Sequence, residues 1–138
     1  MENPGRLQRL PWPGEGEVFL DGAHNPEGAQ ALREALRFHG LLPAAFVLAF
    51  SRDKDHAAMA EAFRGLGPVV LTRYASPRSQ DPKALLPLFP GAQVEEDPLR
   101  ALKRALALER RAVVAGSLYL VGEVLRGLRG LPPEERWQ

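Results

Sequence analysis

Short apolar runs alternate with longer segments of helical periodicity along almost the whole chain. Runs of strand length, bounded by polar residues or glycine, predict β-strands at residues 18–21, 45–50, 68–72, 93–95 and 112–115. Segments with apolar residues every three or four positions predict helices at residues 26–38, 55–64, 82–88, 98–108 and 117–128. Residues 6–10 are a candidate for one more strand at the edge of the sheet.

Strands that alternate with helices are typical of an α/β domain. We expect one domain over residues 1–138, with three layers: a mostly parallel sheet of about five to six strands and helices on both of its faces. Residues 131–138 are polar and rich in proline, so we expect them to form a loose tail.

Composition narrows the class of protein. The 138 residues are 45% hydrophobic and 25% charged, which is typical of a globular domain, and the net charge of +1 gives no electrostatic case for nucleic acid. The chain has no cysteine, no signal-like segment and no apolar run long enough to cross a membrane, so we expect a cytoplasmic protein without membrane contact. Scarce asparagine and 13 prolines hint at a thermophile.

Three predicted strands are followed by polar residues that could bind a ligand or take part in catalysis. These junctions are residues 21–25, residues 51–56 and residues 116–119. The carboxyl ends of parallel strands meet at one edge of a sheet, where open α/β sheets bind ligands. We therefore expect the three junctions to line one cleft.

The first junction holds an acid and an imidazole. Asp21 can accept a hydrogen bond from a sugar hydroxyl or hold a metal-bound water, and His24, three residues later, is expected to lie over the exposed amides of the coming helix. A solvated loop pair is the alternative interpretation of these two residues. Asn25 is interpreted mainly as a helix cap, with Pro26 as the first helical residue.

The other junctions allow both a binding role and a structural one. Lys54 can meet a substrate carboxylate, while residues 53–55 also suit a solvated helix start. Ser117 can hold a carboxylate or phosphate oxygen, or serve as a plain N-cap, and Tyr119 is a candidate for the core. The chain has no G-x-x-x-x-G-K-[ST] loop and no Gly-x-Ser-x-Gly elbow, which argues against a self-sufficient nucleotide hydrolase or a serine hydrolase.

With these motifs in order, the chain resembles the C-terminal domain of folylpolyglutamate synthase/dihydrofolate synthase, a branch of the Mur ligase superfamily. The resemblance covers nearly the whole chain. It is carried by the elements Pro4-Gly5-Arg6, Leu20-Asp21-Gly22-Ala23-His24-Asn25-Pro26, Arg52-Asp53-Lys54-Asp55, Ser76-Pro77-Arg78 and Gly116-Ser117-Leu118-Tyr119-Leu120-Val121-Gly122. The second and last elements are the specific ones, and no role is assigned to Arg78.

The resemblance implies a Rossmann-like fold and a share in an ATP-dependent ligation. Such enzymes use ATP and Mg²⁺ to phosphorylate the terminal carboxylate of a pteroate or folate, and the amino group of L-glutamate then displaces the phosphate. The family's N-terminal/central ATPase domain holds the P-loop, the magnesium ligands and a modified lysine, all of which are missing from this chain. The chain is therefore expected to be inactive alone, as an expression truncation, a proteolytic product or one piece of a split gene.

The resemblance also implies roles for single residues. Arg6 would reach the ATP phosphates, Asp21 would accept from the ATP ribose, and His24, the catalytic candidate, would lie between nucleotide and glutamate. Ser117 would help to hold the carboxylate of the incoming glutamate, with Lys54 as a neighbour. No metal ligand is implied here. Two alternatives stay open: another Mur-type amide ligase acting on a cell-wall precursor, and a stand-alone nucleotide-binding or interaction module.

Overall fold

One mixed sheet of six strands forms the centre of the computed structural model, which describes residues 6–130. The order of the strands across the sheet is β1-β2-β6-β3-β4-β5. β1 runs antiparallel to β2, and every other neighbouring pair is parallel. The strands are β1 (Gln8–Leu10), β2 (Glu17–Leu20), β3 (Ala45–Leu48), β4 (Val69–Leu71), β5 (Gln93–Val94) and β6 (Arg111–Ala115).

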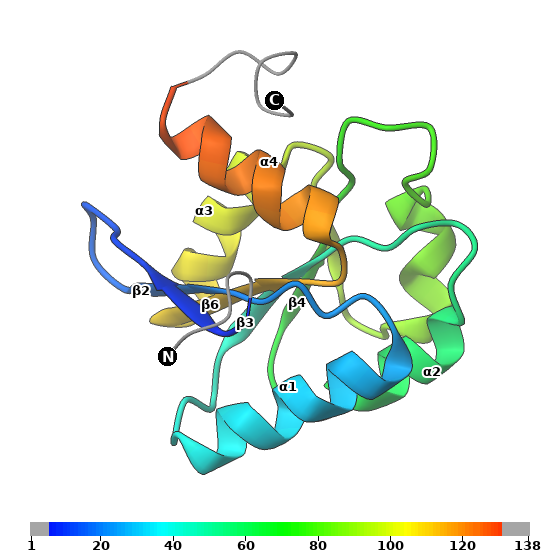
Figure 1. Cartoon of the computed structure of the whole chain (residues 1–138), viewed down its shortest axis with the longest axis horizontal. Helices are drawn as coiled ribbons and strands as arrows, with labels where there is room; N and C mark the ends of the chain where they lie inside the picture. Colours follow the sequence, from blue (N-terminus) through cyan, green and yellow to red (C-terminus); the bar gives the residue numbers. More distant parts are fainter. Residues whose placement is uncertain (1–5, 131–138) are drawn as a thin grey trace.

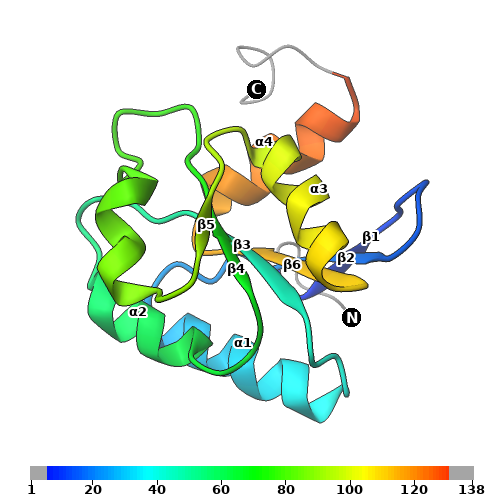
Figure 2. The ribbon, with the colours of Figure 1, turned by 180° about the vertical axis from the view of Figure 1, so that it is seen from behind.

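Helices cover both faces of the sheet, as the alternating pattern predicts. The helices α1 and α2 lie on one side of the sheet, and α3 and α4 lie on the other (Figure 1), which the view from behind also shows (Figure 2). Their bounds are α1 (Pro26–Phe38), α2 (His56–Phe63), α3 (Pro98–Leu108) and α4 (Leu118–Leu128), with the short helix η1 (Pro82–Leu88) between β4 and β5. No helix within residues 6–130 is long and apolar enough to cross a membrane.

The central strand β6 divides the core into two clusters. Val113 and Ala115 pack with α1 and α2, whereas Ala112 and Val114 pack with α3 and α4, and all four are fully buried. A strand covered on both faces needs apolar residues at every position, which explains its continuous apolar run. Each valine that leaves water in this way contributes roughly 1.5–3 kcal/mol.

The predicted α/β fold with its mostly parallel sheet and helices on both faces is confirmed, and residues 8–10 form the additional edge strand as β1. The helix predicted at residues 82–88 is a 3₁₀ helix, because Pro87 has no amide to donate and disfavours a continuous α-helix. The proposed tail at 131–138 and residues Pro4 and Gly5 of the first motif element lie outside the described residues.

Candidate functional site

The carboxyl ends of β2, β6 and β3 meet at one edge of the sheet because these strands are parallel and adjacent. The three polar junctions therefore lie at the same edge, but they do not line one cleft as expected, because the cavity described below includes none of residues 51–56. A backbone contact joins the first and last junctions directly: the amide of Gly116 donates to the carbonyl oxygen of Ala23 over 2.9 Å. Gly116 has φ +109°, and a Cβ at this position would lie 2.3 Å from the carbonyl oxygen of Ala49. Only glycine allows the last strand to turn into α4 here.

A cavity of about 730 Å³ opens at this edge and extends along α1. Arg6, Asp21 and His24 line its polar end, Leu118 of α4 borders it, and His39 lines it beside the end of α1. Its volume falls in the range of small-molecule sites, about 300–1,000 Å³. Three of the predicted site residues therefore share one cavity.

Asp21 is buried, with 5% of its surface exposed, and each of its carboxylate oxygens accepts one backbone amide. Oδ1 accepts from Ala23 over 2.8 Å, and Oδ2 accepts from Leu7 over 2.9 Å. Burial raises the pKa of Asp21, while the two amides and the nearby charge of Arg6 oppose that shift. Each oxygen keeps a further lone pair, so the carboxylate can still accept from a ligand hydroxyl.

His24 is exposed, and its ring is oriented by its own loop. Its Nδ1 lies 2.9 Å from the carbonyl oxygen of Gly22, so this nitrogen carries the proton and donates it. That arrangement leaves Nε2 without a partner within residues 6–130, available to a ligand or a proton.

The start of α1 has few free backbone amides that could bind an anion. The side chain of Asn25 accepts from the amide of Gly28 over 2.7 Å, which confirms it as the N-cap, and Pro26 has no amide. Of the first helical positions only Glu27 keeps an amide with no acceptor among the described residues, beside its own carboxylate. The imidazole of His24 therefore does not lie over a set of free helix amides.

The start of α4 differs, because Ser117 and Leu118 have no acceptor for their amides within the described part of the chain. Ser117 itself is the N-cap: its Oγ accepts from the amide of Tyr119 over 3.1 Å, and only 3% of the residue is exposed. Ser117 does not line the cavity, although the next residue does. At this helix start, Leu118 therefore borders the cavity and Ser117 does not.

Lys54 is not brought into the cavity. It lies half-buried in the loop after β3, where its amide donates to the carbonyl oxygen of Ser51 over 3.3 Å. The imidazole Nε2 of His56 donates to the same carbonyl over 2.7 Å. Asp55 caps α2 by accepting from the amide of Ala58, so this junction mainly forms the start of a helix in the structure.

Sequence reasoning missed Tyr74, which connects the ends of three strands. Its hydroxyl lies 2.7 Å from Oγ of Ser51, and its ring stacks on Tyr119 with centroids 5.6 Å apart. Tyr74 is 1% exposed and Tyr119 45%, so the expectation of a core position for Tyr119 is wrong. No local pattern marks Tyr74, because it follows β4 in a loop that only the tertiary fold covers.

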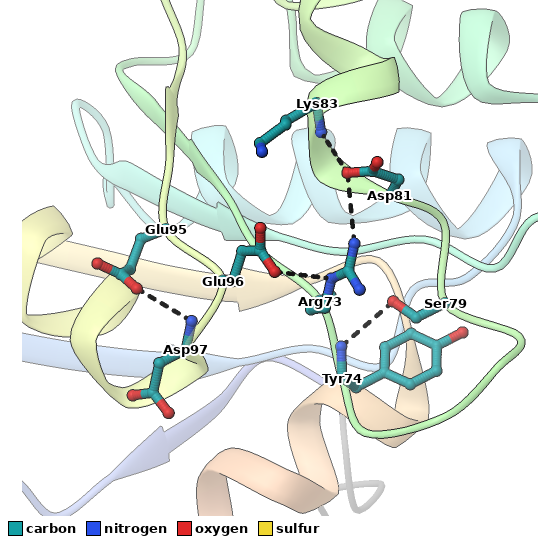
Figure 3. Close-up of polar contacts among 8 residues, drawn as sticks. All are labelled: Arg73, Tyr74, Ser79, Asp81, Lys83, Glu95, Glu96 and Asp97. Atoms are coloured by element: carbon teal, nitrogen blue, oxygen red, sulfur yellow. Dashed lines mark hydrogen bonds and ion pairs between the residues drawn. The ribbon is translucent and has the colours of Figure 1, made fainter.

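Ion pairs of Arg73 join the segments that follow β4 and β5 (Figure 3). Arg73 lies 3.3 Å from a carboxylate oxygen of Asp81 and 3.4 Å from one of Glu96. Asp81 also accepts from the amide of Lys83, so its carboxylate is engaged twice. Among residues 6–130 no group of three His, Cys, Asp or Glu side chains is arranged to hold a metal ion.

Comparison with known proteins gives a consistent result. The family described as "Mur ligase, glutamate ligase domain" matches residues 5–121. A folylpolyglutamate synthase from Thermotoga maritima is 36% identical and superposes with a TM-score of 0.84, covering 99% of this chain and 33% of that protein. The Mycobacterium tuberculosis folylpolyglutamate synthase complexed with ADP and AMPPCP is 29% identical, with a TM-score of 0.80, over 96% of this chain and 33% of that one.

A ligase of another name is similar to the same degree in sequence. The UDP-N-acetylmuramoyl-L-alanyl-D-glutamate–2,6-diaminopimelate ligase of Caulobacter vibrioides is 36% identical over 135 residues, which cover 90% of this chain and 28% of that protein. The chain thus spans about a third of the length of the two solved relatives and less than a third of this one.

Proposed function

This chain belongs to the Mur ligase family of ATP-dependent amide ligases, as a glutamate ligase domain, and we propose that it is the C-terminal domain of a folylpolyglutamate synthase/dihydrofolate synthase. In this proposal the whole enzyme activates a pteroate or folate carboxylate as an acyl phosphate, which L-glutamate then attacks. This domain supplies one wall of the site for nucleotide and glutamate, and a central ATPase domain supplies the other.

The observation that carries the proposal is the convergence of Arg6, Asp21 and His24 on one cavity at the carboxyl edge of the sheet. A nucleotide carries hydroxyls and phosphates, so it requires both an acceptor and cationic or amide donors. The carboxylate of Asp21 is the acceptor and the guanidinium group of Arg6 is the donor, while the free Nε2 of His24 can accept a proton or a hydrogen bond. His24 is then the group of this domain that can hold a proton near the reacting carboxylate.

These residues fit ATP but not its metal ion. ATP would supply the phosphoryl group that activates the substrate carboxylate, and Arg6 would bind its phosphate oxygens. The described residues contain no cluster of acids to ligate Mg²⁺, so we place the magnesium ligands in the central domain. We place the substrate carboxylate of glutamate at the start of α4, with Ser117 as the cap of that helix and Lys54 as a more distant contributor.

The folate assignment is supported by the TM-score of 0.84 over 99% of this chain. A second candidate, a cell-wall ligase that adds a diamino acid, is supported by the 36% identity to the Caulobacter enzyme. We prefer folate because the Asp-Gly-Ala-His-Asn-Pro and Gly-Ser-Leu-Tyr elements match the folate branch. Folate and ATP are found in the cytoplasm, so we propose that the enzyme is cytoplasmic.

The test is a ligation assay of the whole enzyme, reconstituted from the complete coding sequence. We expect release of phosphate with dihydropteroate or folate plus L-glutamate, and none with a muramoyl nucleotide plus diaminopimelate. Turnover of the muramoyl nucleotide alone would overturn the folate assignment, and a coding sequence without a P-loop domain would favour a stand-alone binding module. We expect the isolated chain to be inactive and to bind ATP weakly, since the phosphate loop lies in the central domain.

A further inference from the structure

We propose that Asp21 is a positioning residue that fixes Arg6 at the mouth of the cavity, and that through Arg6 it strengthens the binding of polyphosphate anions. The inference rests on the proposed function in one respect, namely that the cavity receives phosphates. It assigns to the carboxylate a task that does not depend on a ribose.

The first support is the bond between Asp21 and the segment that carries Arg6. Oδ2 of Asp21 accepts from the amide of Leu7, fourteen positions away in sequence, over 2.9 Å. This amide belongs to the residue directly after Arg6. The position of the Leu7 backbone determines where the arginine side chain leaves the chain, so the carboxylate sets the origin of the guanidinium group.

The second support is the conformation of Leu7, which needs an external constraint. Leu7 has φ +42°, a left-handed value that is unfavourable for a non-glycine residue and persists only where its surroundings enforce it. Three contacts do so here. The amide is held by Asp21, the side chain packs against the core cluster beside α1, and the next residue, Gln8, pairs with Leu20 of β2.

The third support is the state of Arg6 itself. Arg6 is exposed, lines the cavity together with Asp21, and forms no ion pair within the described residues. A long arginine side chain loses much rotamer freedom when it binds an anion. Fixing its backbone beforehand leaves only the side chain to be ordered on binding, in the way that preorganisation raises affinity in other sites.

The proposal can be separated from two simpler roles of Asp21. If the carboxylate acts only by its charge, its removal leaves the cavity more positive, and binding of any polyanion becomes tighter. If it acts only as a ribose acceptor, its removal leaves binding of a phosphate chain without ribose unchanged. If it positions Arg6, its removal weakens binding even of a phosphate chain that carries no ribose.

The experiment is an NMR titration of this chain with inorganic tripolyphosphate, using backbone amides of residues 6–39 as reporters. Glu27→Ala is the matched control, because Glu27 lines the same cavity and its replacement removes the same charge without touching Leu7. We expect Asp21→Ala to weaken binding about tenfold, as Arg6→Ala does, and Glu27→Ala to tighten it. In an Arg6→Ala background, Asp21→Ala should have no further effect.

Two further measurements show whether weaker binding in Asp21→Ala results from unfolding of the domain or from a local change at Leu7. Hydrogen exchange at the Leu7 amide should accelerate in Asp21→Ala, while the amides of α3 and α4 stay protected. Asp21→Asn keeps the size of the side chain but only one acceptor oxygen, so it should give an intermediate affinity.

Tighter or unchanged binding in Asp21→Ala, full additivity with Arg6→Ala, or no saturable binding by the unchanged chain would each overturn the proposal. These outcomes are independent of the ligation assay, because a muramoyl substrate preference would contradict the folate assignment and leave the role of Asp21 intact.

Discussion

Gly116 allows a direct test of how closely the strands must approach beneath the cavity. We expect Gly116→Ala to destabilise the domain strongly, because φ is +109° there and the new Cβ would lie 2.3 Å from the carbonyl oxygen of Ala49 and 2.9 Å from the ring of Phe50. A left-handed conformation costs an alanine about 1–2 kcal/mol. Forcing β3 and β6 apart to make room adds about 1–3 kcal/mol.

The expected loss in the free energy of unfolding is therefore about 2–5 kcal/mol, a large share of the roughly 5–15 kcal/mol of a typical domain. Gly40→Ala is the matched control, since Gly40 also has a positive φ, +66°, but no atom lies within 4 Å of the place that its Cβ would take. That control should lose only about 1–2 kcal/mol.

Urea unfolding followed by circular dichroism measures both variants against the unchanged chain. A loss in Gly116→Ala no greater than in Gly40→Ala would refute the reasoning, because it would mean that the contact between Gly116 and Ala49 relaxes without cost. A larger m-value would instead point to a change in the unfolded or native ensemble.

Two further predictions concern the first junction. Burial raises the pKa of Asp21 above its ordinary value of 3.8, so between that pH and the raised pKa the native state binds more protons than the unfolded state. The unchanged chain should therefore lose stability relative to Asp21→Asn as the pH rises through the raised pKa. Urea titrations from about pH 3 to 7 measure this difference, and a relative gain in stability would contradict the prediction. Asn25→Ala removes the acceptor for the amide of Gly28 and should cost about 1 kcal/mol in urea unfolding, whereas Asn25→Asp keeps an acceptor and should cost much less; equal losses would argue against capping.

The cavity is built from parts that serve the fold as well. Asp21 holds the segment before β1, and Asn25 caps α1. Because the same residues stabilise the fold and line the cavity, their structural and functional interpretations are hard to separate in the sequence. A carboxylate that accepts two amides still has lone pairs for a ligand, so a structural contact does not exclude a binding role.

Within the site, sequence reasoning reached the edge of the sheet and the residues of the first junction. It did so because Asp21 and His24 directly follow an apolar run and precede a capped helix, a local pattern that needs no knowledge of contacts. It placed Lys54 and Ser117 by the same logic, yet the structure leaves Lys54 outside the cavity and turns the Ser117 side chain into its own helix. The direction of a side chain at a junction depends on neighbouring strands, which no local pattern encodes.

The sequence by itself determined the class of the fold, because the periods of its apolar residues distinguish strands from helices and their alternation favours a parallel sheet covered on both faces. It also determined the helix start at Asn25 and limited the start of the second helix to residues 53–55, since capping involves only residues a few positions apart. Tertiary structure alone decided which contacts complete the site. The amide of Leu7 on Asp21, the hydroxyl of Tyr74 near Ser51 and the approach of Gly116 to Ala49 join residues 14, 23 and 67 positions apart, and such pairs are created only when strands settle into their order in the sheet.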